Sequence, residues 1–447
     1  MFAGREAELK FLDSHYKKES SQILVLYGRK GLGKTTLLKH FVQDKDFFYY
    51  MGRPCSSREQ YFQWGQEIKG AGAVLPPYPD LEELLTASLS RAELTHSKKI
   101  LILDEFQYFV KADETFMSNL IQYAKNPKNA GPLLVILCSS ATGWVENSMV
   151  SKIGRAALAF SGLWKVRELK YQEMRRLFLE YSDRDFLTNI SVLGGNPGLW
   201  KYFSADLSPA ENIQRTILDV SGRLREEVLI WLSEELREPA VYQTILAGLA
   251  SGKHKLNELH VHTGFSRAKI SVYLKNLMEL DLVEKVSSLG DNGKGHVQKG
   301  IYRISNSLVQ FYFQYLFANQ TDLELLDAVQ FYDKHIRDSL WQFEEAAYRK
   351  LCAENLSDHY DKLGEWIGKD GVLPILGETK NGERIACQCL YHRAPDLSEH
   401  RDFMKNLRLS GWKPNKIIYF CEHLPSTEVC RKLGKDQIQM ISIFLQE

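Results

Sequence analysis

The sequence predicts an α/β fold built on a parallel β-sheet, and three apolar runs carry this prediction. Residues 22–28, 99–104 and 133–138 are short, continuous and apolar, which is typical of strands buried on both faces. Helix-compatible sequence lies between them, for example at residues 81–94. Because buried strands that alternate with helices pair in parallel, we expect a layered sheet in the N-terminal part of the chain.

Length and composition describe an ordinary globular chain with more than one domain. At ~150 residues per domain, 447 residues predict about three domains. With 44% hydrophobic and 25% charged residues, the chain is not disordered as a whole. The 57 Lys and Arg residues balance 56 Asp and Glu residues, so the net charge of +1 argues against a polybasic nucleic-acid coat or membrane-surface binder. A local basic patch is still compatible with this balance.

The cysteines and the start of the chain favour a cytoplasmic protein. Seven scattered cysteines, an odd number, do not form the pattern of a disulfide framework. Residues 1–6 include an early acidic residue and no apolar segment, unlike a secretory signal. The longest apolar runs are far shorter than the ~18–20 residues of a membrane span. We therefore expect a soluble protein with no membrane partner.

The segment that follows the first predicted strand matches a phosphate-binding loop. Residues 28–35 fit the pattern G-x-x-x-x-G-K-[ST] at every fixed position, between a strand and a helix. The glycines let successive backbone N–H groups surround a β-phosphate, Lys34 reaches the β- and γ-phosphates, and the Thr35 hydroxyl binds Mg²⁺. The predicted ATP-binding residues of this segment are Gly28, Gly31, Gly33, Lys34, Thr35 and Thr36.

Two carboxylates end the second predicted strand. Asp104 is expected to hold the Mg²⁺ shell, and Glu105 to orient or deprotonate the attacking water, so Lys34, Asp104 and Glu105 are the predicted catalytic residues. An adjacent Asp-Glu pair favours hydrolysis of ATP over binding alone. The alternative is that the pair merely caps a helix.

Polar residues after the third predicted strand are candidate sensors. Ser139 and Ser140 are placed to sense the γ-phosphate or position water, and a helix cap is an equally weighted alternative. Arg155 is placed to contact the γ-phosphate in its own chain or in a neighbouring subunit, although a solvated surface arginine explains it as well.

Residues 241–305 have the order helix–helix–helix–hairpin of a winged helix. Ser266 is the expected cap of a third helix that runs to Leu280, with Ile270, Tyr273, Leu274 and Leu277 on its inner face. Residues 290–295 are the expected hairpin tip. The preceding residues 171–240 read as helical around a turn at residues 194–198.

A modest basic excess accompanies this helical segment. Residues 251–305 hold nine Lys and Arg against five Asp and Glu, a difference of 9 − 5 = +4. Binding of duplex DNA through its phosphates is one reading, and packing as an interaction module is the other. The predicted DNA contacts are Arg267, Lys269, Lys275, Lys294 and Lys299.

The ordered motifs together resemble the archaeal-type ATPases, which are AAA+-like ATPases of the STAND class. The segments that carry the resemblance are residues 2–9, 28–35, 104–107, 193–197, 235–239 and 302–306. The resemblance implies a P-loop NTPase parallel sheet with a helical lid, followed by a winged helix and a small α/β restriction-endonuclease-like domain. It also implies that the Arg5 region lies over the adenine side of the nucleotide, and that Pro197 of the lid stands near the base or ribose.

The resemblance implies a division into five segments. These are residues 1–165 for the ATPase core, 166–238 for the lid, 239–306 for the winged helix, 307–338 for a helical linker and 339–447 for a degenerate nuclease-like domain.

The C-terminal segment lacks most residues of a working PD-(D/E)xK nuclease. Glu344 matches the first-helix glutamate, but no carboxylate stands at residues 372–374. Gln388 and Leu390 occupy the Glu and Lys positions of the E-x-K motif, so we expect no nuclease activity. The letters E-x-K at residues 378–380 stand beside a predicted turn. A zinc site is not expected either, because the C-x-C spacing at residues 387–389 is not the usual one.

The sequence therefore predicts an ATP- and Mg²⁺-dependent ATPase that drives a conformational or assembly switch. Its partner is expected to be duplex DNA, another protein or a homo-oligomer of the same chain. The main alternative is a nucleotide-loaded regulatory protein with little turnover. A small-molecule kinase is a third reading, which the appended domains do not suit.

Overall fold

The computed structural model describes residues 2–70, 72, 74–90, 98–126, 131–289, 300–369, 371–423, 426–435 and 438–442. The chain divides into two compact units. The first contains residues 1–169, 196–200 and 234–237, and the second contains the remaining residues. Within the described ranges, no helix has the length and apolar character needed to cross a membrane.

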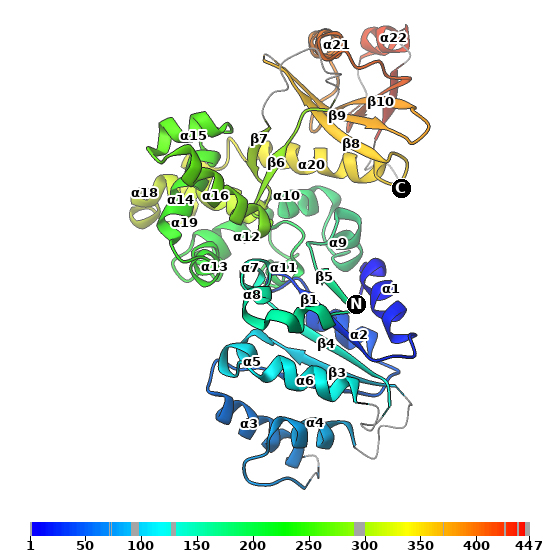
Figure 1. The fold of residues 1–447 in the computed structure, drawn as a ribbon. Coiled ribbons are helices and arrows are strands. Elements are labelled where there is room, and N and C mark those ends of the chain that lie inside the picture. Colours follow the sequence, from blue (N-terminus) through cyan, green and yellow to red (C-terminus); the bar gives the residue numbers. More distant parts are fainter. Residues whose placement is uncertain are drawn as a thin grey trace. The chain divides into compact units, whose positions relative to one another are not determined.

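The first unit is built on a five-stranded parallel sheet in the order β2-β3-β4-β1-β5 (Figure 1). The strands are β1 (Gln22–Tyr27), β2 (Phe47–Met51), β3 (Lys99–Asp104), β4 (Leu133–Ser139) and β5 (Gly162–Lys165). This confirms the predicted α/β class and the three predicted strands β1, β3 and β4. The two edge strands escaped the prediction because neither is a continuous buried run: β2 alternates between buried and exposed residues, and β5 has only four residues.

Helices cover both faces of this sheet. The helical elements of this unit are α1 (Glu6–Tyr16), α2 (Lys34–Phe41), α3 (Ser57–Gly70), α4 (Leu81–Leu89), α5 (Gln107–Ala112), α6 (Phe116–Lys125), α7 (Thr142–Asn147), α8 (Met149–Ile153), the 3₁₀ turn η1 (Gly154–Ala159) and α11 (Pro197–Trp200). Helix α4 ends at Leu89, earlier than the predicted residue 94, and residues 91–97 lie outside the described part of the chain.

The alternation of side chains along β1 explains why two cores form. Ile23 and Val25 pack in a cluster with residues of α3, α4 and α6, whereas Leu24 and Leu26 pack in a second cluster with residues of α1 and α2. All four side chains are almost fully buried, and burial of each one stabilises the fold by roughly 1.5–3 kcal/mol. Strand β1 is thereby fixed on both faces, and so is the loop that follows it.

The second unit begins with helices and includes the segment that was predicted as helix–helix–helix–hairpin. Helix α16 is capped by Ser266, whose side chain accepts from the Lys269 N–H, and it buries Ile270, Leu274 and Leu277 as predicted. Tyr273 was predicted on the same inner face, but it is only half-buried, and its hydroxyl donates to the Glu238 carboxylate. The predicted hairpin tip lies outside the described residues.

The elements of this helical part continue to residue 335. They are α9 (Tyr171–Leu177), α10 (Asp183–Leu193), α12 (Pro209–Ile213), the π turn η2 (Gln214–Leu218), α13 (Glu227–Glu235), α14 (Pro239–Ala250), α15 (Leu256–Thr263), α16 (Arg267–Glu279), β6 (Val283–Val286), β7 (Ile301–Ile304), α17 (Ser307–Phe311), the π turn η3 (Tyr312–Leu316), the 3₁₀ turn η4 (Phe317–Asn319), α18 (Gln320–Leu325) and α19 (Ala328–His335).

A separate mixed sheet forms the C-terminal region, in the order β12-β11-β10-β9-β8. Strands β8, β9 and β10 are antiparallel, and β10, β11 and β12 are parallel. The elements are α20 (Trp341–Leu356), β8 (Lys362–Ile367), β9 (Val372–Glu378), β10 (Arg384–Leu390), α21 (Leu397–Ser410), β11 (Lys416–Cys421), α22 (Thr427–Lys435) and β12 (Ile438–Ile441). Residues 379–383 connect β9 to β10; Glu378 is the last residue of β9, and Lys380 lies in the predicted turn.

Candidate functional site

The predicted phosphate loop connects β1 to α2 at the carboxyl edge of the parallel sheet. Gly31 and Gly33 have a φ of 86°, in the left-handed region that favours glycine. A Cβ atom on Gly28 would lie 2.3 Å from the carbonyl oxygen of Val166, so no larger residue fits there. Helix α2 begins at Lys34, and the N–H groups of its first turn have no acceptor within the helix. The loop and the helix start therefore have the backbone form of an anion-binding site.

Lys34 lies inside this loop. Its Nζ donates to the carbonyl oxygens of Gly28 at 2.5 Å and Arg29 at 3.1 Å. Burial lowers the pKa of the Lys34 ammonium, while Glu105 and other nearby acidic groups act in the opposite direction. Lys34 therefore lies within the backbone curve that the motif uses to hold phosphate groups.

Asp104 and Thr35 come together as predicted. The Thr35 hydroxyl lies 3.4 Å from Oδ2 of Asp104, and the Glu105 N–H donates to Oδ1 of the same carboxylate at 2.9 Å. Because a hydroxyl and a carboxylate are hard oxygen ligands, this pair suits Mg²⁺.

Tyr49 is a site residue that sequence reasoning missed. Its hydroxyl donates to Oδ2 of Asp104 at 2.7 Å. Burial, followed by this hydrogen bond to Asp104, raises the pKa of Tyr49, so the hydroxyl stays protonated and remains a donor. The sequence feature that could have revealed Tyr49 is the aromatic run of residues 47–50. This run forms strand β2, which pairs with the strand that ends at Asp104.

The carboxylate of Glu105 is held by a network of three donors. Its Oε2 accepts from Gln107 Nε2 at 2.6 Å, from the Ser140 N–H at 3.1 Å and from the Ser140 hydroxyl at 2.8 Å. The backbone of Glu105 has a φ of 51°, an uncommon conformation for a residue other than glycine. Such strained residues persist where the surrounding contacts fix them, as they do here.

The two candidate sensor serines belong to this network. The Ser139 hydroxyl donates to Gln107 Oε1 at 2.7 Å and accepts from the Ala141 N–H at 3.1 Å. The helix-cap reading of the serines is wrong, because Ala141 is the N-cap residue of α7 and neither serine side chain caps the helix. Ser140 instead contacts Glu105 directly, and Ser139 contacts Gln107, which donates to the same carboxylate.

Arg5 contacts the phosphate loop from outside. Its guanidinium donates to the carbonyl oxygen of Leu32 at 2.8 Å and pairs with Glu8 at 2.9 Å. Arg5 itself is almost completely buried. The structure thus places Arg5 against the backbone of the loop, where it supports the loop conformation.

The turn at residues 194–198 also contacts the phosphate loop. Asn196 Nδ2 donates to the Lys30 carbonyl oxygen at 3.2 Å, and the Gly198 N–H donates to the Gly31 carbonyl oxygen at 3.0 Å. The approach is close enough that a Cβ atom on Gly198 would lie 2.6 Å from the Cα atom of Gly31. Two glycines therefore permit a direct backbone contact between this turn and the loop.

Glu235 is a second residue that sequence reasoning did not place. Its carboxylate oxygens accept from the backbone N–H groups of Thr142 at 3.1 Å and Gly143 at 2.8 Å, at the start of α7. Burial raises the pKa of Glu235, and these two hydrogen bonds oppose the shift. The segment 235–239 was noticed in the sequence only as part of the family resemblance.

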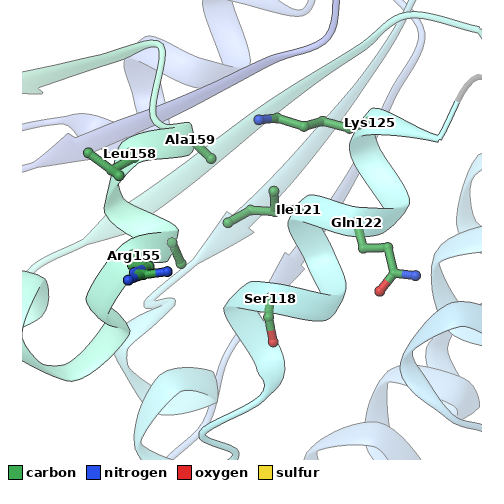
Figure 2. Close-up of a pocket in the computed structure, with 8 residues that line it drawn as sticks. Ser118, Ile121, Gln122, Lys125, Arg155, Leu158 and Ala159 are labelled. Carbon is green, nitrogen blue, oxygen red and sulfur yellow. The ribbon is translucent and has the colours of Figure 1, made fainter.

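The structure does not bring Arg155 to these residues. Arg155 is exposed on η1, and it lines a shallow hollow of about 400 Å³ between η1 and α6 (Figure 2). Four of the eight residues that line the hollow are isoleucine, leucine or alanine, and the other four are Arg155, Ser118, Gln122 and Lys125. Its position supports the surface-arginine reading within a single chain.

Three of the five predicted DNA contacts lie on α16 in the second unit. Arg267 donates to Asn257 Oδ1 at 3.2 Å, Lys269 lies 4.8 Å from the centre of the Phe265 ring, and Lys275 lies 3.6 Å from the Glu279 carboxylate. Arg267 and Lys275 are exposed, and Lys269 is half-buried. The other two, Lys294 and Lys299, fall outside the described residues.

Comparisons with known proteins place the N-terminal part of this chain beside ATPases. Residues 2–203 match the family described as "ATPase domain predominantly from Archaea". The uncharacterized protein MJECL04 of Methanocaldococcus jannaschii is 24% identical over 400 residues, which cover 86% of each chain. The uncharacterized ATP-binding protein MJ0423 of the same organism is 40% identical over 45 residues, which cover 10% of this chain and 76% of that protein.

A solved structure shares the fold. The Walker-type ATPase PABY2304 of Pyrococcus abyssi is similar with a TM-score of 0.50 and 17% identity, over 70% of this chain and 96% of that one. Residues 2–203 thus match the model of an archaeal-type ATPase domain, and the parallel sheet of this part resembles that of P-loop ATPases.

Proposed function

We propose that this protein is a Mg²⁺-dependent ATPase that uses hydrolysis to drive a conformational or assembly switch. The observation that carries the proposal is the convergence of Lys34, Thr35, Asp104 and Glu105 at one edge of the parallel sheet. The match of residues 2–203 to an ATPase family supports it. We name ATP and Mg²⁺ as the cofactors.

The Thr35 hydroxyl and the Asp104 carboxylate are the residues that would hold Mg²⁺. When bound, the ion supplies charge neutralisation for the phosphate oxygens. Tyr49 restrains Oδ2 of Asp104 through its 2.7 Å hydrogen bond, so the carboxylate keeps a fixed orientation toward Thr35. Such outer partners of metal ligands commonly contribute to metal affinity.

The remaining residues bind phosphate and activate water. The loop N–H groups and Lys34 bind the phosphate chain. Glu105 accepts a proton from the attacking water through Oε1, the oxygen that is not engaged by Gln107 or Ser140. Ser140 and Gln107 fix the other oxygen, which orients the carboxylate.

Phosphate release by wild type and by Glu105→Gln tests the proposal. We expect Mg²⁺-dependent release from wild type and near-background release from the variant, with nucleotide binding retained. Equal, near-background rates for both proteins would instead support a nucleotide-loaded regulatory protein. The hydrogen bonds from Ser140 and Gln107 to Glu105 favour this second candidate. A carboxylate that the protein itself holds in place also suits a site that binds nucleotide without hydrolysing it.

We further propose the division into a core at residues 1–165, a lid at 166–238, a winged helix at 239–306, a linker at 307–338 and a degenerate nuclease-like domain at 339–447. The order α14, α15, α16, β6, β7 supports the winged helix. The order α20, β8, β9, β10, α21, β11 supports the nuclease-like fold.

Nuclease activity does not form part of the proposal. Glu344 accepts from the Thr188 hydroxyl at 2.6 Å and lies 3.3 Å from His392, so this carboxylate is engaged in contacts within the protein. Leu390, at the expected lysine position, is fully buried. Cys387 and Cys389 are buried as well, which suits core residues better than zinc ligands.

Duplex DNA is the partner we propose for the winged helix, and a protein partner or a second copy of the chain is the alternative. The exposed Arg267 and Lys275 and the half-buried Lys269 of α16 support DNA, because phosphate contacts need accessible Lys and Arg side chains. Gel-shift titration with duplex DNA at low salt tests it. No shift under these conditions would exclude DNA as the partner.

A further inference from the structure

Glu235 anchors the loop that holds the candidate catalytic base. Both of its carboxylate oxygens accept backbone N–H groups, from Thr142 at 3.1 Å and from Gly143 at 2.8 Å. A carboxylate that accepts from two consecutive N–H groups at a helix start makes charge-assisted hydrogen bonds, which are stronger than those between neutral groups. Glu235 is separated from these two residues by more than 90 positions in the chain, so the contact is a tertiary one.

The anchored residues are separated from the Glu105 network by one residue. Ala141 lies between Ser140 and Thr142, and its N–H donates to the Ser139 hydroxyl at 3.1 Å. Ser140 binds Glu105 directly, and Ser139 binds it through Gln107. A shift of the loop between β4 and α7 therefore changes the position of both Ser140 donors on Glu105 Oε2.

The environment of Glu235 suits a group that acts through its hydrogen bonds. The side chain is partly buried, and Lys34 attracts its charge. Burial raises the pKa of Glu235, but the Gly143 and Thr142 N–H groups favour the ionised form. The neighbouring Glu234 is exposed.

Glu235 lies at a point where the chain passes from the second unit into the first. Glu235 is the last residue of α13, and the residues of that helix up to Ser233 belong to the second unit. The chain returns to the second unit at Glu238, directly before α14. Only residues 234–237 join the first unit here, and Glu235 is the member that bonds to the β4–α7 loop.

We propose that Glu235 is a positioning residue, which makes the orientation of Glu105 depend on the segment that joins α13 to α14. This inference rests on the proposed ATPase function. A partner that binds the second unit and displaces this segment would release the β4–α7 loop and change the hydrolysis rate without touching the nucleotide. The nucleotide-binding loop is held by contacts of its own with Arg5 and Asn196, so its affinity for nucleotide would change much less than the hydrolysis rate.

The test compares Glu235→Gln and Glu235→Ala with the matched control Glu234→Gln in the full chain. Steady-state hydrolysis gives kcat and KM, a fluorescent ATP analogue gives nucleotide affinity, and amide hydrogen exchange reports on residues 139–147.

We expect kcat to fall about 10-fold for the glutamine variant and up to about 100-fold for the alanine variant, because one or both charge-assisted hydrogen bonds are lost. We expect KM and affinity to change less than about 2-fold, since the lost contact acts on the chemical step. Exchange at Thr142 and Gly143 should accelerate, and Glu234→Gln should match wild type.

An unchanged kcat in a folded Glu235 variant would overturn the inference while leaving the ATPase proposal intact. A parallel loss of kcat and nucleotide affinity would also overturn it, because that pattern indicates general damage to the fold. If wild type itself does not hydrolyse ATP, the proposed function fails. Amide hydrogen exchange then decides whether Glu235 holds the β4–α7 loop. Unchanged exchange at Thr142 and Gly143 in the variants would contradict that contact as well.

Discussion

The Tyr49 hydroxyl donates to Oδ2 of Asp104 over 2.7 Å, which ties an edge strand of the sheet to the carboxylate at the end of its neighbour. The same oxygen lies 3.4 Å from the Thr35 hydroxyl. Asp104 thus has partners on the phosphate-loop side and on the β2 side. Its orientation is set by the first unit alone.

Tyr49→Phe should weaken the use of Mg²⁺. The change removes one hydroxyl and leaves the ring, so the sheet edge keeps its packing while Asp104 loses a donor. We expect the Mg²⁺ concentration for half-maximal ATP hydrolysis to rise about 10-fold, as for other outer partners of metal ligands. Mg²⁺ titration of phosphate release measures it. Tyr50→Phe is the control, because the Tyr50 hydroxyl donates to the Gln60 carbonyl oxygen at 3.2 Å instead. Equal Mg²⁺ curves for the two variants would contradict the role of Tyr49.

Glu105→Gln should separate hydrolysis from binding. Glutamine keeps the size of the side chain but cannot take a proton from water, so we expect kcat to fall about 10²- to 10⁴-fold. Affinity for an ATP analogue should remain within a few-fold of wild type, because Lys34 and the loop N–H groups are unchanged. Phosphate release and analogue titration measure the two quantities. Retention of more than a tenth of the wild-type kcat would show that another group is the base.

Gly198→Ala should disturb the phosphate loop through a steric clash. The added methyl group would lie 2.6 Å from the Cα atom of Gly31 and 2.9 Å from its carbonyl oxygen. We expect the protein to lose about 1–3 kcal/mol of stability and to bind nucleotide more weakly, because the loop or the turn must shift. Thermal unfolding and ATP-analogue titration measure both effects. Gly70→Ala is the control, since nothing lies within 4 Å of a Cβ atom at that position. The hypothesis is wrong if the two variants bind nucleotide equally well.

Neutralising two cations of α16 should weaken any binding of duplex DNA. Arg267→Ala combined with Lys269→Ala removes two candidate phosphate contacts. We expect weaker binding at low salt, and a slope of log affinity against log salt that is smaller by about 0.9 per lost contact. Lys334→Ala is the control, because that lysine pairs with Asp322 on a different helix. An unchanged salt slope in the double variant would place the DNA contacts elsewhere.

Glu354→Gln should make the second unit more stable at neutral and higher pH. Burial raises the pKa of Glu354 from 4.5 to about 7, although the carboxylate accepts the Tyr171 N–H at 2.8 Å. Between these two values the folded state binds a proton that the unfolded state releases, so the contribution of Glu354 to stability falls as pH rises. Glutamine is neutral throughout and avoids this loss.

We therefore expect Glu354→Gln to exceed wild type by about 2 kcal/mol at pH 8, and the difference to vanish below about pH 4. Denaturant unfolding at a series of pH values measures it. Glu383→Gln, at an exposed position, should show no such difference. A constant difference across the pH range would mean that Glu354 does not titrate as described.

The parts that the sequence predicted are those with a local physical signature. The strands β1, β3 and β4 are continuous apolar runs, and the phosphate loop has fixed glycine spacing, so both were visible along the chain. Tyr49 and Glu235 were not, because each acts across a tertiary contact that depends on the position of a distant element. The role of Ser140 was open for the same reason: a serine after a strand suits several partners, and only the folded chain shows that it binds Glu105.

The backbone contact between Gly31 and Gly198 has a thermodynamic consequence. Residues 196–200 belong to the first unit, but the chain on either side of them, at Gly195 and Lys201, belongs to the second. Any ligand that favours one arrangement of the phosphate loop must therefore favour one arrangement of this turn. Linkage makes the effect reciprocal, so a client that fixes the turn changes nucleotide affinity by the same factor as nucleotide changes the affinity for the client. Nucleotide affinity can then be measured with and without a candidate client. A difference between the two affinities gives the coupling free energy and identifies the client, even before its binding surface is known.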